Sequence, residues 1–270
     1  MISCKPQRAK VRRRATGAKR GRRILVGTSG GLYELRGDEC VQIQELAGRE
    51  ITALAREERA RWAIVDGRQL WRARRDGAWQ EVAKVKGRRL TCMVPATAGL
   101  YVGTESAHLL RLADGALVPV RSFEEADGRQ EWYTPWGEPA EVRSIAVDRG
   151  GGIYVNVHVG GVVRAEDGGR SWKPTLDIET DVHQVIAHPT RAGFVLVAAA
   201  VGFGVSRDGG DSWSFQTEGL HATYLRAVAI AGNTALVTAS TGPGSRRNAI
   251  YRKALDRDEP FERCREGLPE

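Results

Sequence analysis

Residues 206–213 read SRDGGDSW, and a near copy, AEDGGRSW, stands forty-one positions earlier at residues 165–172. Each copy places an aspartate and two glycines shortly before a tryptophan. An aspartate can accept hydrogen bonds from nearby backbone N–H groups, and glycine adopts positive φ without steric cost, so each copy is expected to form a tight turn. We expect the tryptophan that ends each turn, Trp172 or Trp213, to pack between neighbouring sheets.

Both turns belong to a longer repeat, seen in IYVNVHVGGVVRAEDGGRSW (153–172) and VLVAAAVGFGVSRDGGDSW (195–213). Each segment contains a β-branched strand, a glycine turn, a second strand and the aspartate turn. Weaker copies begin at residues 24, 62, 100 and 235, and another short strand precedes every copy after the first. The unit therefore has four short strands, A to D, in about 40 residues, which is typical of a propeller blade. The sequence predicts an all-β propeller with six blades or parts of blades in residues 24–270.

The SRDGGDSW turn resembles the Asp-box, or BNR, repeat of sialidase-like and sortilin-like β-propellers, whose pattern is S-x-D-x-G-x-[ST]-W. Residues 206–213 match the pattern fully, and residues 165–172 carry Ala165 in place of the serine. The resemblance covers about residues 24–268 and implies a propeller of the WD40/YVTN/BNR-like superfamily. It says little about function, because the turn joins strands C and D of one blade. We interpret both turns as scaffold.

Blade one begins at its strand B, ILVGT at residues 24–28, without a strand A of its own. The last residues, EGLPE (266–270), match EGL at 218–220, which precedes strand A of blade six. We therefore expect a seven-bladed propeller truncated at its C-terminus. Two alternatives are imperfect closure, which leaves a strand edge open to pairing, and filling of the gap by KVRRRAT at residues 10–16.

The net charge of +8 is concentrated at the N-terminus, where residues 1–23 hold ten Lys/Arg and no Asp/Glu. We expect this segment to be a basic disordered tail that could contact nucleic acid or an anionic membrane surface. The remaining residues carry 31 basic and 33 acidic side chains, a net charge of −2, so the folded part is not expected to bind nucleic acid.

The four cysteines, Cys4, Cys40, Cys92 and Cys264, are widely spaced and form no CxxC pair. This spacing argues against a zinc site and a disulfide framework and favours a cytoplasmic location. No apolar run is long enough to cross a membrane, and no apolar stretch follows the basic tail as in a secretory signal. We expect no metal and no cofactor.

In a propeller, the D–A and B–C connections share the face opposite the Asp-box turns, which we call the funnel face. Alignment of the A strands brings five polar residues to equivalent positions near the axis: Thr52, Thr91, Arg143, His183 and Arg226. Alignment of the B–C turns adds Glu105, His158 and Ser240. Two arginines and a histidine that converge on one channel favour an anionic ligand. In the alternative interpretation, the histidines line the channel and bond to water.

The D–A connection between blades three and four is lengthened by FEEADGRQEWYTPWGEP (123–139), which carries Trp132, Tyr133 and Trp136. Such aromatic rings could stack on a sugar or another flat ligand, or the tryptophans could pin down the loop. Two further D–A connections contribute Asp181 and His221, the latter followed by Tyr224. The histidines His158, His183 and His221 suffice in number for a metal, but their spacing does not specify one.

Three functional hypotheses follow. The leading one is a binding module whose funnel holds an anionic or carbohydrate-like ligand or a protein partner. The second is a glycoside hydrolase, either sialidase-like or a carboxylate-dependent exo-glycosidase, with Glu105, Asp181 and Glu138 as candidate acids; it needs two carboxyls about 5 Å or about 6.5–9.5 Å apart. The sialidase resemblance also implies an arginine triad that begins in an RIP-like motif, which is absent here. The third is an assembly scaffold that grips a partner through Arg143 and Arg226.

Overall fold

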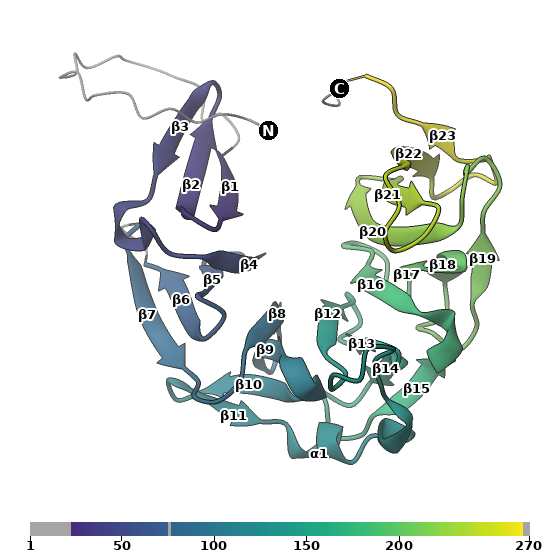
Figure 1. Cartoon of the computed structure of the whole chain (residues 1–270). Helices are drawn as coiled ribbons and strands as arrows, with labels where there is room; N and C mark the ends of the chain where they lie inside the picture. The colour runs from purple at the N-terminus through teal and green to yellow at the C-terminus, as the bar shows by residue number, and fades with distance from the viewer. Residues whose placement is uncertain (1–22, 75–76, 267–270) are drawn as a thin grey trace.

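The computed structural model describes residues 23–74 and 77–266. Its strands form six sheets, and in each sheet the strands are hydrogen-bonded in chain order to antiparallel neighbours. Figure 1 shows these sheets as blades around a common axis. The fold predicted from the repeat is thus confirmed as an all-β, six-bladed propeller with four-stranded antiparallel blades. Blade one has three described strands, which correspond to B, C and D.

The blades have the following strands. Blade one holds β1 (Arg23–Thr28), β2 (Gly31–Arg36) and β3 (Glu39–Gln42), and blade two holds β4 (Ile51–Arg56), β5 (Arg61–Val65), β6 (Gln69–Ala73) and β7 (Trp79–Lys84). Blade three holds β8 (Leu90–Ala96), β9 (Gly99–Thr104), β10 (Leu109–Ala113) and β11 (Ala116–Pro119), and blade four holds β12 (Val142–Val147), β13 (Ile153–Val157), β14 (Gly161–Ala165) and β15 (Lys173–Leu176). Blade five holds β16 (Val182–Ala187), β17 (Val195–Ala199), β18 (Gly202–Ser206) and β19 (Ser214–Gln216), and blade six holds β20 (Tyr224–Ala231), β21 (Thr234–Ser240), β22 (Asn248–Ala254) and β23 (Glu262–Arg263).

The connections contain one short α-helix and four single 3-10 turns in the described residues. They are α1 (Arg121–Glu124), η1 (Gln44–Leu46), η2 (Glu105–Ala107), η3 (Arg129–Glu131) and η4 (Ile178–Thr180). None of the helices in the described part of the chain is both long and apolar enough to span a membrane.

The core lies between the blades. The middle strands β13 (IYVNV) and β17 (VLVAA) are buried along their whole length, because each blade is covered on both faces by its neighbours. Aliphatic β-branched residues suit such strands, since they pack well on a pleated surface. Separate clusters of buried side chains join successive blades, for example blades three and four around Phe123 and Val155 and blades five and six around Phe203 and Val237.

The Asp-box turns form as expected. In blade four, Asp167 Oδ1 accepts hydrogen bonds from the backbone N–H groups of Arg170 (2.7 Å) and Ser171 (3.1 Å), and both glycines of the turn have positive φ. The Ser171 hydroxyl, which donates to Asp167 Oδ2 at 2.7 Å, lowers the pKa of the Asp167 carboxyl, and the two backbone hydrogen bonds act in the same direction. Trp172, which ends the turn, is 3 % exposed and meets Phe123 of the preceding connection edge-on, with ring centroids 5.2 Å apart. Its predicted packing between sheets is confirmed.

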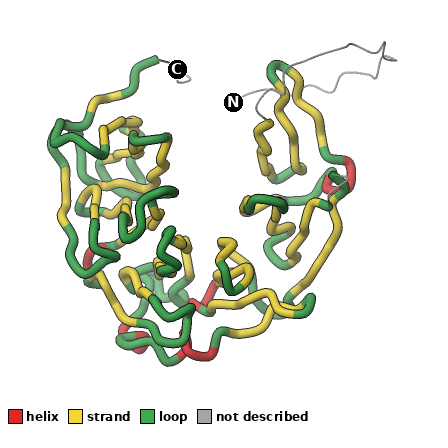
Figure 2. The backbone as a smooth tube through the Cα atoms, turned by 180° about the vertical axis from the view of Figure 1, so that it is seen from behind, coloured by secondary structure: helices red, strands yellow, loops and turns green. Residues whose placement is uncertain are grey.

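The described residues form an incomplete ring of blades. Figure 1 and the reverse view in Figure 2 show blade one and blade six on either side of an opening, with the ends of the described chain beside it. The seventh blade expected from the sequence is not among the described residues, so that expectation stays a prediction. Nearly all of the basic tail, including the KVRRRAT segment and Cys4, also lies outside the described residues; Arg23 already belongs to β1.

Candidate functional site

A β-bulge recurs at the start of every A strand in blades two to six. In blade four, Val142 faces Val157 and Ser144 faces Asn156, so Arg143 is the extra residue between two paired positions. The same shift occurs in the other four blades, and the extra residues are Thr52, Thr91, Arg143, His183 and Arg226. These are the five positions aligned from the sequence. A bulge redirects a side chain out of the regular alternation, which explains why polar residues occupy a strand that is otherwise apolar.

Two of these bulge residues join neighbouring A strands. Thr91 donates a hydrogen bond of 2.5 Å to the carbonyl oxygen of Val142, and His183 Nδ1 lies 2.6 Å from the carbonyl oxygen of Leu225. In both cases the acceptor is the residue just before the bulge of the next blade. In the described residues no strand ladder joins adjacent A strands, and these two side chains are among the groups that form hydrogen bonds between blades; the backbone N–H groups of Val185 and Val228, which donate to Ser144 Oγ and Gln184 Oε1, form others.

His183 is the centre of a compact cluster in blades four to six. Its side chain is 5 % exposed, its Nε2 lies 3.4 Å from Asp181 Oδ2, and its ring is 4.6 Å from the ring of Tyr224. A backbone carbonyl, a carboxylate and an aromatic ring already surround the imidazole. His183 therefore positions its neighbours and has little surface left to contact a ligand. We call Arg143, His158, Asp181, His183 and Tyr224 the axial site.

Asp181 is the acidic member of the axial site. It follows η4 and adopts a left-handed backbone conformation, with φ 46°. The hydrogen bond with His183 is the main cause that lowers the pKa of the Asp181 carboxyl, although burial opposes it, and the charge of Arg143 acts in the same direction as His183. Its Oδ1 is buried and has no hydrogen-bond partner among the described protein groups. The site therefore holds an ionised carboxylate with one unused acceptor.

Arg143 is accompanied by a second carboxylate that the sequence analysis missed. Its Nε lies 3.3 Å from Glu141 Oε1, and the Arg143 side chain remains 24 % exposed. The signal was present in the sequence, since Glu141 stands two positions before Arg143, but only the structure shows that the two side chains meet. Two carboxylates thus offset the positive charge that favoured an anionic ligand.

His158 begins the B–C turn of blade four, where its backbone N–H donates to the carbonyl oxygen of Glu141 at 2.9 Å. The residue is 6 % exposed. Burial of the ring, together with the nearby positive charge of Arg143, lowers the pKa of His158 from 6.5 to about 4. The imidazole is therefore neutral at neutral pH.

This lowered pKa predicts a pH-dependent stability. Unfolded His158 gains a proton near pH 6.5 and the folded residue only near pH 4, so folding should lose stability as the pH falls from 6.5 to 4 and be unaffected above that window. The loss should approach about 3 kcal/mol. Urea unfolding of wild type and His158→Gln at pH 7 and pH 4.5 measures it: the variant should lose clearly less stability. Equal losses in the two proteins would contradict the assignment.

The three aromatic residues of the connection between blades three and four differ in how far they are buried. Trp132 is half-buried, lies 5.5 Å from the Phe123 ring and is covered by the guanidinium of Arg129 at 4.9 Å, so it anchors the loop. Trp136 is 69 % exposed and lies 5.6 Å from the His158 ring, and Tyr133 is 44 % exposed. Trp136 and Tyr133 therefore present ring surface to solvent at the edge of the axial site, whereas Trp132 does not.

Two other residues predicted from the sequence, Arg226 and His221, are not part of the axial site. Arg226 Nη2 donates to the carbonyl oxygen of Pro243 at 2.6 Å, and its guanidinium lies 5.4 Å from the centre of the Tyr224 ring. His221 is not brought to the axial site by any described contact; its ring stacks on Tyr251 at 5.8 Å and its Nδ1 lies 2.9 Å from the Tyr251 hydroxyl. Strand C of blade six, which carries Tyr251, thus holds this histidine away from the axis.

Of the candidate acids, Glu105 has a bracing role. Its Oε1 accepts a hydrogen bond of 2.8 Å from the backbone N–H of Arg89, and Asp66 makes the equivalent bond of 3.0 Å with Glu50 in blade two. Both carboxylates hold the B–C turn to the start of strand A. Glu138 is exposed. Among the described residues, no group of three or more His, Cys, Asp or Glu side chains is arranged to hold a metal ion.

Comparisons with known proteins place the fold. No protein-family model matches the sequence, and no curated protein matches it. Ycf48 from Cyanidioschyzon merolae is similar with a TM-score of 0.63 at 13% identity, over 88% of this chain and 79% of that one. A Ycf48 bound to D1 peptide gives 0.60 at 12% identity, over 91% and 78%. The GH74 xyloglucanase of Xanthomonas campestris gives 0.68 at 16% identity, over 92% of this chain but 44% of the enzyme. At such identities the likeness concerns the fold alone.

Proposed function

We propose that this chain is a non-catalytic binding module that holds a peptide segment of a partner protein on its funnel face, across the axial site and Trp136. The observation that carries the proposal is the mixed character of the site: a partly exposed arginine, an ionised aspartate whose side chain is 33 % exposed and an exposed indole lie together. A peptide offers the matching set of carbonyl acceptors, N–H donors and apolar side chains.

The balance of charge supports a peptide more than a small anion. Glu141 accompanies Arg143, Asp181 lies beside His183, and His158 is neutral at neutral pH, so positive charge does not dominate the axial site. A simple anion would meet two carboxylates at close range, whereas an extended segment can place a donor at Asp181 and an acceptor at Arg143.

The comparisons lend the proposal some support. A propeller of the same fold, Ycf48, binds a D1 peptide, which is a precedent for a protein partner on such a scaffold. The candidate acids support binding over hydrolysis, because Glu105 is occupied by a backbone N–H group and the lowered pKa of Asp181 makes it a poor proton donor. Glycoside hydrolysis by an enzyme of GH74-like fold is the alternative that the test must exclude.

Peptides selected from a random library against the full chain provide the test. We expect Arg143→Ala and Trp136→Ala each to weaken binding of a selected peptide at least tenfold, or by about 1.4 kcal/mol. Arg149→Ala, an exposed arginine in the A–B turn on the opposite face, is the matched control and should bind as wild type. Unchanged affinity in both site variants would refute the peptide site. Hydrolysis of xyloglucan oligosaccharides that is lost in Asp181→Asn would establish the enzyme instead.

A further inference from the structure

Blade one presents an open strand edge toward the axis. In the other five blades the innermost strand is an A strand, whereas the sheet order β1-β2-β3 makes β1, a strand B, the innermost described strand of blade one. On its other side, β1 pairs with β2 along its full length. Its inner edge pairs with no strand in the described part of the chain, and Ile24 and Val26 are 55 % and 36 % exposed. Such an edge offers a row of backbone donors and acceptors to another strand.

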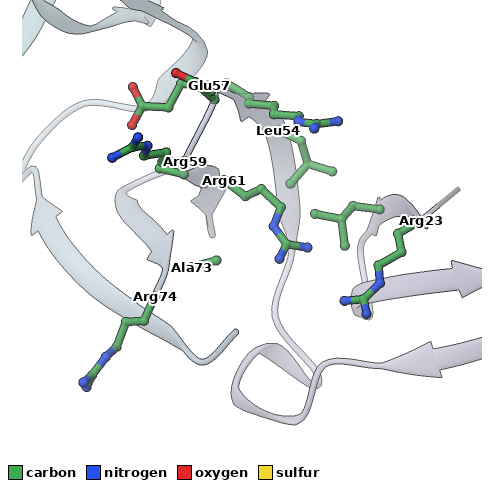
Figure 3. Close-up of a pocket in the computed structure, with 12 residues that line it drawn as sticks. Arg23, Leu54, Glu57, Arg59, Arg61, Ala73 and Arg74 are labelled. Atoms are coloured by element: carbon green, nitrogen blue, oxygen red, sulfur yellow. The ribbon is translucent and has the colours of Figure 1, made fainter. Parts of the chain in front are cut away.

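A groove with a volume of about 840 Å³ runs between this strand and blade two. Its apolar part includes Leu25 of β1 and Leu54 of β4. Figure 3 shows that Leu54 and Arg61 of blade two and Arg23 of blade one turn toward the same space, whereas Arg74 points away from it. The groove opens near the A–B turn of blade two, residues 57–60, and therefore on the face opposite the axial site.

The groove is strongly basic. Its lining contains five arginines, of which Arg74 points away from the open space, and two glutamates: Arg23, Arg56, Arg59, Arg61, Arg74, Glu57 and Glu58. Arg23 lies 3.6 Å from Glu34. Among the described residues, no acidic group lies within salt-bridge distance of the other three arginines closest to the A–B turn, Arg56, Arg59 and Arg61. A chain segment in this groove would meet Leu25 of β1 and Leu54 of β4, and an excess of positive charge at one end.

We propose that β1 accepts an extended segment of a partner protein as a fourth and innermost strand. This segment alternates apolar with polar residues and has acidic residues at its C-terminal end. The segment would run antiparallel to β1, as every described A strand runs relative to its strand B. Its C-terminal end then lies beside Arg23, where β1 begins, and acidic residues there pair with Arg23 and Arg61. Main-chain hydrogen bonds provide the affinity and the arginines select the sequence and its direction.

The chain's own A strands show what such a segment should look like. In blade four this strand reads EVRSIAVD, residues 141–148, with apolar residues at Val142 and Ile145 and an aspartate at the end that corresponds to the basic turn. A synthetic peptide of this sequence with two further aspartates is therefore a suitable probe, and the same peptide ending in three lysines is its matched counterpart. Neither peptide depends on the identity of the natural partner.

Binding of the labelled peptides to the full chain, followed by fluorescence anisotropy, tests the proposal. The acidic peptide should bind at least tenfold more tightly than the lysine peptide, and Arg23→Glu/Arg61→Glu should reverse this preference. Arg149→Glu, which lies in the equivalent A–B turn of blade four, should bind as wild type. No binding of the acidic peptide, or an unchanged preference in the double variant, would overturn the proposal.

Hydrogen exchange separates strand addition from attraction by charge alone. The bound acidic peptide should protect backbone amides of residues 23–28 and leave those of the axial site unchanged. Binding without protection of β1 would overturn the strand-addition proposal, as would a single-stranded oligonucleotide that displaces the peptide and binds more tightly. The double variant should still bind the peptides selected on the funnel face, so a failure here and a failure of the proposed function are distinguishable.

Discussion

Gly161→Ala is expected to destabilise the propeller by about 3 kcal/mol or more. Gly161 closes the B–C turn of blade four with φ 66°, a conformation that costs an alanine about 1 kcal/mol. A Cβ at this position would also collide with the backbone carbonyl oxygen of Leu176 on β15, which cannot move without disturbing the sheet. The same turn carries His158 and supports Trp132, so near-ultraviolet circular dichroism should change together with the midpoint of urea unfolding.

Gly115→Ala is the matched control. Gly115 has φ 76° in the turn between β10 and β11, and nothing lies within 4 Å of a Cβ built there. The Gly115→Ala variant should lose only about 1 kcal/mol of stability, the cost of the positive φ for an alanine, and should keep the wild-type near-ultraviolet circular dichroism spectrum. Equal losses of stability in the two variants would mean that the contact between the new Cβ at position 161 and the carbonyl oxygen of Leu176 has no energetic cost.

His183→Ala is expected to cost about 3 kcal/mol and to loosen blade six from blade five. The substitution removes the hydrogen bond to the carbonyl oxygen of Leu225, leaves Asp181 without its partner and opens a cavity beside Tyr224. Urea unfolding measures the loss of stability. Relative to wild type, hydrogen exchange in the variant should be accelerated more in β20 than in β8.

Arg226→Ala provides the control for position, because Arg226 occupies the equivalent bulge in blade six but is exposed. Its removal should change the free energy of unfolding by no more than about 0.5 kcal/mol. If His183→Ala were equally mild, the histidine would not be a structural link between blades, and a role in direct ligand contact would become the better explanation.

The equivalence of the axial positions could be predicted from the sequence, but their roles could not. Thr91, Arg143 and His183 fall at one place in the repeat, and alignment of the repeats is sufficient to find it. Whether such a side chain bonds to the next blade or remains available depends on its length and on the distance to the neighbouring A strand. Thr91 and His183 reach the next carbonyl group, whereas Arg143 meets Glu141.

The same limit applies to the aromatic loop. The composition of residues 123–139 left open whether the tryptophans stack on a ligand or pin down the loop; Trp132 packs on Phe123, whereas Trp136 stays exposed. Both residues are tryptophans in one polar loop, and only the path of the backbone over the core distinguishes them. His221 is a further example, since Tyr251, thirty residues away along the chain, determines where its ring lies.

By itself, the sequence determined the architecture. Short strands with β-branched residues, glycine turns and the SRDGGDSW repeat are local features, because hydrogen bonds and allowed backbone angles within about 40 residues produce each blade. Only the tertiary structure decided what the blades present to each other: the ionised Asp181 beside a buried His183, the neutral His158, and the basic groove beside the open edge of β1. These properties arise from burial and from charges that different blades bring together, and neither is encoded in the spacing of residues along one strand.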